Sequence, residues 1–208
     1  AVPSSAFVLL TNGYRVVDQY WVDHISVAAQ AAVGSSMFVL VVAYASFELV
    51  SAGAGPLLAR AVGAKAPDEQ RSVLGAALAL ALAVGAAWTV LGGVFAHPLA
   101  VSLGLEAAAR IEAERYLAAL ALTSLPLVLT PLLDAAFLAL GDARSPLALH
   151  ALALGLNLVL TPLFALTLDG GVVGAALASN ASRGVATAWG LILLARRTGL
   201  RTADLGLG

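Results

Sequence analysis

Residues 72–98 read SVLGAALALALAVGAAWTVLGGVFAHP, and this run decides the fold class because it contains no Asp, Glu, Lys or Arg. A helix needs about 20 apolar residues to cross the hydrocarbon core of a bilayer, so the run predicts a membrane-spanning helix. The rest of the chain has the same character. Of its 208 residues, 61% are hydrophobic and 11% are charged, which is too little charge for the surface of an ordinary soluble domain. We therefore predict an all-α membrane protein.

Five further apolar runs have a similar length, and none shows the alternation of a β-barrel. We predict one domain of six transmembrane helices. Their approximate spans are 2–22, 34–60, 72–98, 107–140, 145–168 and 171–194. Several spans contain proline, which membrane helices tolerate because neighbouring helices and water satisfy the freed carbonyl groups. The chain starts without Met and inside an apolar run, so we expect it to be a fragment of a longer protein.

The orientation follows from Lys and Arg, which collect on the cytoplasmic side of membrane proteins. Seven Lys and Arg residues lie on the side of the membrane that holds the two chain ends, and two lie on the other side. The seven are Arg60, Lys65, Arg71, Arg144, Arg196, Arg197 and Arg201, and the two are Arg110 and Arg115. We predict an integral protein of the bacterial inner membrane with both ends in the cytoplasm. The net charge of −1 leaves no basic surface for nucleic acid.

Four polar residues within the spans lie at a similar depth. At 1.5 Å per helical residue, the distances to the nearest loops place Asp18, Asn157, Thr161 and Ser179 in the outer half of the membrane. A carboxylate, an amide oxygen and two hydroxyls together suit a proton or a small hard cation. Two simpler explanations exist. Arg15, three residues before Asp18, could neutralise it, and the two hydroxyls could bond carbonyls of their own helices.

The remaining polar residues in the spans are candidates for the lining of a cavity, since charge in a bilayer core usually faces water or a partner. They are Arg15, Glu48, Asp134, Asn180 and Arg183. Glu48 and Asp134 could instead pair with Arg183 or be buried as neutral carboxyls. We place His150 near the cytoplasmic end of its span, at the membrane interface. GxSxG, HExxH and cysteine are absent, so we expect no enzyme, no cofactor and no metal site other than Na⁺ at the four-residue site.

Five segments taken in order resemble a known family, and they cover nearly the whole chain. They are Pro3 with VVDQYWV (16–22), ARAVGAKAPDEQ (59–70), LALGDARSP (138–146), LNLVLTPLF (156–164) and GVVGAALASNAS (171–182). This set resembles the amino-terminal lobe of the multidrug and toxic compound extrusion (MATE) transporters. The resemblance implies one lobe of a two-lobe, twelve-helix transporter that exports organic cations and amphipathic compounds by H⁺ or Na⁺ antiport.

The resemblance also implies an ion site at Asp18, Asn157, Thr161 and Ser179. Many relatives have a second carboxylate where this chain has Thr161, and a single carboxylate favours H⁺ over Na⁺ as the coupling ion. We expect a small-molecule substrate, the lipid bilayer and a second lobe as partners, with a lobe on the same polypeptide preferred to a symmetric homodimer. Two alternatives stay open. One is a lobe of a lipid-linked oligosaccharide flippase, which should show several cavity cations where only Arg15 and Arg183 are available. The other is a non-transporting membrane assembly module.

Overall fold

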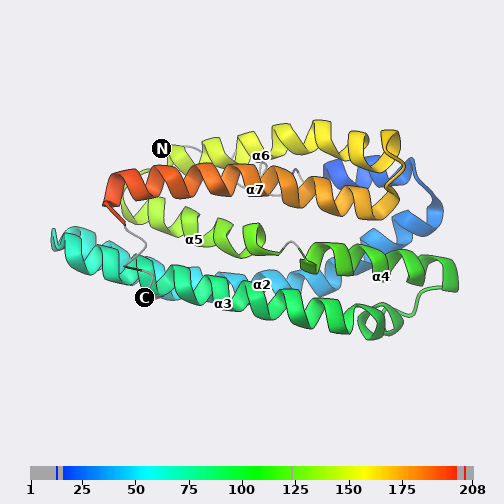
Figure 1. Cartoon of the computed structure of the whole chain (residues 1–208), viewed down its shortest axis with the longest axis horizontal. Helices are drawn as coiled ribbons and strands as arrows, with labels where there is room; N and C mark the ends of the chain where they lie inside the picture. Colours follow the sequence, from blue (N-terminus) through cyan, green and yellow to red (C-terminus); the bar gives the residue numbers. More distant parts are fainter. Residues whose placement is uncertain (1–12, 14–15, 123, 201–203, 205–208) are drawn as a thin grey trace.

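Long helices lying side by side make up the structure, a computed structural model that describes residues 13, 16–122, 124–200 and 204 (Figure 1). Residues 16–23 are helical and precede the labelled elements. These are α2 (Val27–Gly63), α3 (Pro67–Ser102), α4 (Ala107–Leu122), α5 (Leu125–Ala139), α6 (Arg144–Pro162), the π-helix η1 (Leu163–Thr167) and α7 (Gly171–Thr198). Among the described residues α2, α3 and α6 with η1 are each apolar and long enough to cross a membrane, and the bent pair of α4 and α5 would add a fourth if the two helices form one span. The prediction of an all-α membrane fold is confirmed.

The helices extend beyond the predicted apolar runs because polar residues cap them outside the hydrocarbon core. The Ser26 hydroxyl accepts a hydrogen bond from the backbone N–H of Ala29 at 3.0 Å and starts α2. Pro67 begins α3, where the missing proline N–H leaves no helical hydrogen bond unmade. At the other end of the chain, Gly199 adopts φ 67° and terminates α7. Counting apolar residues therefore underestimated the lengths of these helices.

The predicted span 107–140 is broken into two helices, α4 and α5, which meet at 55°. Pro126 has no N–H and its ring clashes with the carbonyl one turn back, so a single straight helix cannot form here. Ser124 is buried at the break, and its hydroxyl donates to the carbonyl oxygen of Gly85 on α3 at 3.1 Å. From α7, the Asn180 side chain donates to the carbonyl oxygen of Leu120 at 3.3 Å. A backbone carbonyl of α3 and a side chain of α7 thus stabilise the break.

Two groups of helices pack against each other along the molecule. α6 lies against α7, while α2 contacts α3, α4 and α5, and α5 joins the groups through its contacts with α7 (Figure 1). One end of the bundle carries the α2–α3 and α5–α6 connections and the end of α7. The other end carries the α3–α4 and η1–α7 connections. These four connections therefore alternate between the two ends of the bundle.

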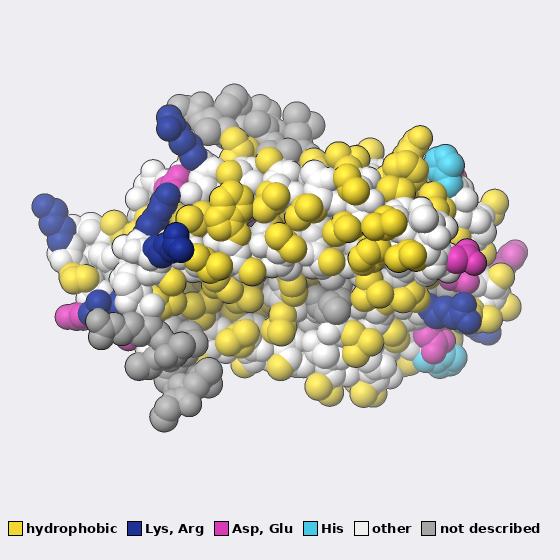
Figure 2. All heavy atoms as spheres, turned by 45° about the horizontal axis from the view of Figure 1, so that its top comes forward, with side chains coloured by type: hydrophobic (Ala, Val, Ile, Leu, Met, Phe, Trp, Pro, Cys, Tyr) yellow, Lys and Arg dark blue, Asp and Glu magenta, His cyan; other side chains and the backbone are white. Residues whose placement is uncertain are grey.

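Residue size differs between the outer surface and the interior. Bulky apolar side chains face outward, among them Phe38, Leu49, Val94, Val159 and Ile192. Figure 2 shows apolar side chains over the middle of one face, with charged side chains gathered at the two ends. Many buried positions hold alanine or glycine instead. A Cβ on Gly92, for example, would lie 2.3 Å from the Cβ of Ala121. Small residues allow this close approach, as membrane helices require.

Candidate functional site

Asp18 lies in the helix of residues 16–23, where it is 6% exposed and faces α6 and α7. From α6 come Asn157 and Thr161, which are both fully buried. They are four residues apart and therefore share one face of the helix. From α7 comes Ser179, also buried. Three helices thus bring together the four residues that depth in the membrane had grouped.

Short hydrogen bonds connect these side chains. The Ser179 hydroxyl contacts both carboxyl oxygens of Asp18, at 2.9 and 2.7 Å. The Asn157 Nδ2 lies 3.2 Å from Asp18 Oδ1 and 3.0 Å from each of the hydroxyl oxygens of Thr161 and Ser179. The Thr161 hydroxyl makes a longer contact of 3.5 Å with Asp18 Oδ1. The carboxyl group is therefore buried and surrounded by hydrogen-bond donors.

The orientation of Asn157 limits what this site can hold. Its amide nitrogen is directed at the other three side chains, whereas its Oδ1 is buried and accepts no hydrogen bond from the described residues. A bound cation would need the amide oxygen in place of the nitrogen. A proton on Asp18 needs no rotation of the Asn157 amide, because the Ser179 hydroxyl beside it can accept a hydrogen bond as well as donate one.

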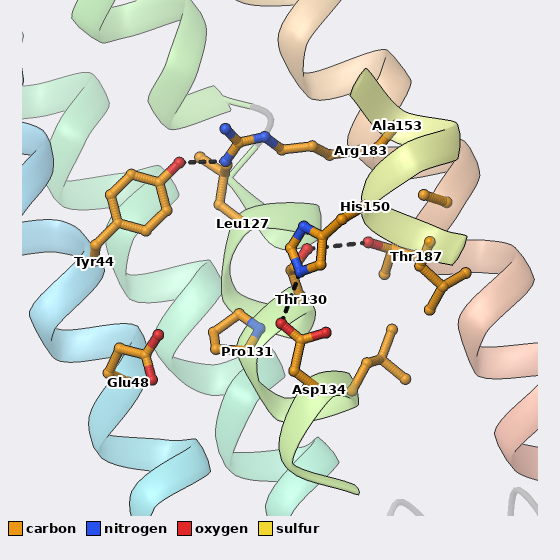
Figure 3. Close-up of a pocket in the computed structure, with 13 residues that line it drawn as sticks. Tyr44, Glu48, Leu127, Thr130, Pro131, Asp134, His150, Ala153, Arg183 and Thr187 are labelled. Atoms are coloured by element: carbon orange, nitrogen blue, oxygen red, sulfur yellow. Dashed lines mark hydrogen bonds and ion pairs between the residues drawn. The ribbon is translucent and has the colours of Figure 1, made fainter. Parts of the chain in front are cut away.

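A cavity of about 220 Å³ lies between α2, α5, α6 and α7. Figure 3 shows Asp134 on α5 and His150 on α6 pointing toward each other, with Glu48 on α2 across the cavity. His150 Nε2 is 2.9 Å from Asp134 Oδ2. The Arg183 guanidinium donates to the Tyr44 hydroxyl and lies over its ring, with 5.7 Å between the guanidinium carbon and the ring centroid. Three of the predicted cavity residues, Glu48, Asp134 and Arg183, therefore line one cavity.

Two of the predicted cavity residues do not join that group. Asn180 follows Ser179 directly, so it points about 100° away around the helix axis and bonds α4 instead. Arg15 falls outside the described residues, and so does the pairing of Arg15 with Asp18. Among the described contacts, Asp134 bonds His150, and Glu48 accepts from Ser51 at 3.0 Å. Arg183, which the alternative explanation paired with these carboxylates, donates a hydrogen bond to Tyr44.

The His150 side chain is buried in the cavity wall, whereas in the sequence only its depth near the cytoplasmic end of the span was considered. A signal was present in the sequence. His150 and Asn157 are seven residues apart, which is close to two helical turns, so they lie on the same face of α6. Once Asn157 was assigned to the interior, that spacing predicted an interior His150 as well.

A comparison with protein families identifies the chain, because the profile of the MatE family matches residues 3–163. The chain belongs to the MatE family. Members of this family are membrane transporters, which confirms the resemblance found in the sequence. Among curated proteins none matches the chain.

Solved structures of MATE proteins and of a MOP superfamily transporter resemble the chain along most of its length. A MOP superfamily transporter from Pyrococcus furiosus is 26% identical with a TM-score of 0.86, over 98% of this chain and 46% of that one. A MATE protein in the bent conformation is 28% identical with a TM-score of 0.83, over 94% and 43%. The inward-facing structure of a multidrug resistance MATE family transporter is 28% identical with a TM-score of 0.82, over 88% and 41%. This MatE chain thus spans less than half the length of these proteins.

Proposed function

We propose that the chain is one lobe of a secondary-active exporter that exchanges H⁺ for small organic cations or amphipathic compounds. Membership of the MatE family supports transport. The observation that carries the coupling is the buried Asp18, which Ser179, Asn157 and Thr161 enclose from two other helices. A buried carboxyl group that exchanges a proton changes the local charge by one unit, and in a dry interior such a change is worth several kcal/mol. That energy can bias the lobe between two conformations.

The geometry favours H⁺ over Na⁺. Among the described residues the site holds one carboxylate, and Thr161, which the family resemblance places where many relatives have a second, is neutral. The amide nitrogen of Asn157 also faces inward, where it repels a metal cation. When Asp18 is ionised, the Ser179 hydroxyl donates to it. When Asp18 is protonated, its carboxyl can donate to Ser179 in return over the same 2.7 Å contact. The two states therefore need only a change in hydrogen-bond direction.

We also propose the setting of the lobe. The end of the bundle with the α2–α3 and α5–α6 connections carries most of the Lys and Arg, so it faces the cytoplasm of a bacterial inner membrane. A second lobe lies on the same polypeptide, since the MATE structures that the chain matches are more than twice its length. A flippase lobe is less well supported. Arg183 shares its cavity with Glu48 and Asp134, and an anionic head group would meet both carboxylates.

Transport by the full-length protein in proteoliposomes tests the proposal. Uptake of the fluorescent cation acriflavine would be measured with a pH gradient alone and with a Na⁺ gradient at equal pH. We expect the pH gradient to drive uptake and Asp18→Asn to abolish it. The control is Asp169→Asn, in an exposed turn where asparagine suits the φ of 56°. Uptake at the wild-type rate in Asp18→Asn would exclude Asp18 as the coupling residue. Uptake driven only by Na⁺ would exclude the proton.

A further inference from the structure

Three exposed arginines lie at the end of the bundle that carries the α5–α6 connection. α6 starts at Arg144, and α7 ends at Thr198, directly after Arg196 and Arg197. The two helices lie side by side and run in opposite directions, so the start of α6 is next to the end of α7 (Figure 1). Figure 2 shows Lys and Arg side chains gathered at this end, with apolar side chains on the surface beside them. We call Arg144, Arg196 and Arg197 the arginine corner.

Asp142 is the carboxylate of the arginine corner, and both of its oxygens already accept hydrogen bonds. Oδ1 accepts the backbone N–H groups of Arg144 and Ser145 at 2.9 and 3.1 Å. Oδ2 accepts the Ser145 hydroxyl at 2.6 Å and the Arg197 guanidinium. Arg144 and Arg196 form no ion pair with any carboxylate among the described residues. Three positive charges and one negative charge give the corner a net charge of +2.

The helix dipoles explain only part of this charge. Arg196 and Arg197 lie in the last turn of α7, where the negative end of the helix dipole favours cations. Arg144 lies in the first turn of α6, where the positive end of the dipole disfavours a cation. The stability of α6 therefore gives no reason for Arg144, whereas an anion bound beside it from outside the chain would offset the repulsion.

An apolar stripe on α7 leads to the corner. Its members, spaced by three or four residues, are Val185, Trp189, Ile192 and Arg196. This spacing places them on one face of the helix, and the three apolar side chains are each about half exposed. Along the helix axis Ile192 lies about 6 Å and Trp189 about 10 Å from Arg196. In a bilayer this face therefore contacts acyl chains directly beneath Arg196.

α6 has an exposed face of the same kind, built from smaller residues. Arg144 begins it, and Ala148, Ala151 and Gly155 follow at intervals of three or four residues, all of them exposed. A Cβ on Gly155 would have nothing within 4 Å. The small side chains leave space along α6 for an acyl chain. On both helices an arginine thus stands at the head of an exposed apolar face, which is the order of phosphate and acyl chain in a phospholipid.

We propose that the arginine corner binds the head group of an anionic phospholipid, with the acyl chains against the exposed faces of α6 and α7. Arginine holds phosphate through two parallel N–H donors, and basic sites at the cytoplasmic ends of membrane helices bind such head groups. The net charge of +2 matches a lipid with two phosphates, which is the chemistry of cardiolipin. The site contains neither Asp18 nor the cavity residues, so it does not depend on the coupling ion.

Quenching of Trp189 by brominated lipids tests the proposal. The full-length protein would be placed in phosphatidylcholine nanodiscs that contain the same fraction of brominated acyl chains, carried either by cardiolipin or by phosphatidylcholine. Bromine quenches indole fluorescence at short range, and the Trp189 signal is the difference between each protein and the same protein with Trp189→Phe. We expect cardiolipin to be preferred at Trp189 by about fivefold for each arginine that it contacts. Equal quenching by the two brominated lipids would overturn the proposal.

Two pairs of substitutions locate the site. Arg144→Gln with Arg196→Gln should reduce the preference for cardiolipin to about that for phosphatidylcholine. The control, Arg60→Gln with Lys65→Asn, removes the same charge at the same end of the bundle from the α2–α3 region, and asparagine suits the φ of 53° at position 65. This control should keep the preference. An equal loss in both double variants would show a diffuse basic surface and overturn the site.

Salt supplies a measurement that needs no arginine variant. A contact between arginine and phosphate at the membrane surface is screened by ions, so the preference of the wild-type protein for cardiolipin should fall as NaCl is added. Quenching by brominated phosphatidylcholine should not change, because it reports only that Trp189 faces lipid. A preference for cardiolipin that is insensitive to salt would contradict binding through the arginine charges.

Discussion

Replacement of Asp18 by asparagine and by alanine separates its hydrogen bonds from its charge. Both variants lose the charge, so the difference between them reports the network around the side chain. The asparagine side chain would keep an acceptor 2.9 Å from the Ser179 hydroxyl and place a donor where Oδ2 now lies 2.7 Å from it. Ser179 would then donate once to residue 18 and accept once from it, so its hydroxyl would stay satisfied. We expect the free energy of unfolding of Asp18→Asn to lie within about 1 kcal/mol of the wild-type value.

Alanine at position 18 removes the acceptor of the buried Ser179 hydroxyl. Asn157 keeps Thr161 and Ser179 as acceptors for its two N–H groups, so the cost falls mainly on Ser179. An unsatisfied buried donor costs about 1–3 kcal/mol. Asp18→Ala should therefore be less stable than Asp18→Asn by about that amount.

The assay is unfolding of the full-length protein in mixed micelles with increasing SDS, followed by circular dichroism at pH 7. Each variant would also be checked for a single monodisperse species before unfolding. The hydrogen bonds around residue 18 account for the difference in stability between Asp18→Asn and Asp18→Ala only if the alanine variant is the less stable one. Equal stability of the two variants, or a more stable alanine variant, would refute the reasoning from the Ser179 contacts.

Three further predictions concern packing, pH and topology. A Cβ on Gly174 would lie 2.3 Å from the carbonyl oxygen of Phe164 and 2.9 Å from the Cα of Ala165. Gly174→Ala should therefore destabilise the protein by about 1–3 kcal/mol in SDS unfolding. In the control Gly155→Ala the new Cβ has nothing within 4 Å, so its free energy of unfolding should stay within about 0.5 kcal/mol of wild type. In the α5–α6 loop, the Ser145 hydroxyl and then the Arg197 guanidinium hold the pKa of Asp142 below its usual range. The stability that this carboxylate contributes is present above its unfolded-state pKa near 4 and is lost as the pH falls through the lower folded-state pKa. Asp142→Asn should therefore lower the free energy of unfolding by up to about 1 kcal/mol at pH 7. Below about pH 4 this difference from wild type should shrink. Single cysteines at Lys65 and Asp169, introduced into a chain without native cysteine, should react with an impermeant thiol reagent from opposite sides of the membrane, and labelling of both from one side would contradict the topology.

The sequence carried enough information to group the candidate ion site because that grouping needs only depth and helical spacing. Asn157 and Thr161 share a helix face wherever the helix lies, and the loops fix how far Asp18 and Ser179 are from the membrane surface. The contact between His150 and Asp134 needs more. It depends on the rotation of α5 and α6 about their own axes, which the packing of their apolar faces determines.

The break between α4 and α5 also lay beyond the sequence pattern. Pro126 was one of several prolines inside apolar runs, and Pro131 is tolerated within α5. What distinguishes the break is the supply of partners from other helices. Ser124 bonds Gly85 on α3, and Asn180 reaches Leu120 from α7. Because those partners come from distant parts of the chain, Pro126 alone could not show that the helix ends there.

The contrast between a bulky exterior and a small-residue interior determines which amino-acid substitutions this lobe can tolerate during evolution. On the outer face, Phe38 or Val94 can become any large apolar residue, because lipid tails adjust to the new shape. At Ala32, Ala81 or Ala113 the exposed fraction is 0%, and even the two extra methyl groups of valine have no free space. Alanine and valine codons differ by one nucleotide, so this ordinary change is neutral outside and harmful inside. Lineages of this lobe should therefore diverge in the identity of their outer residues and retain the size of their inner ones.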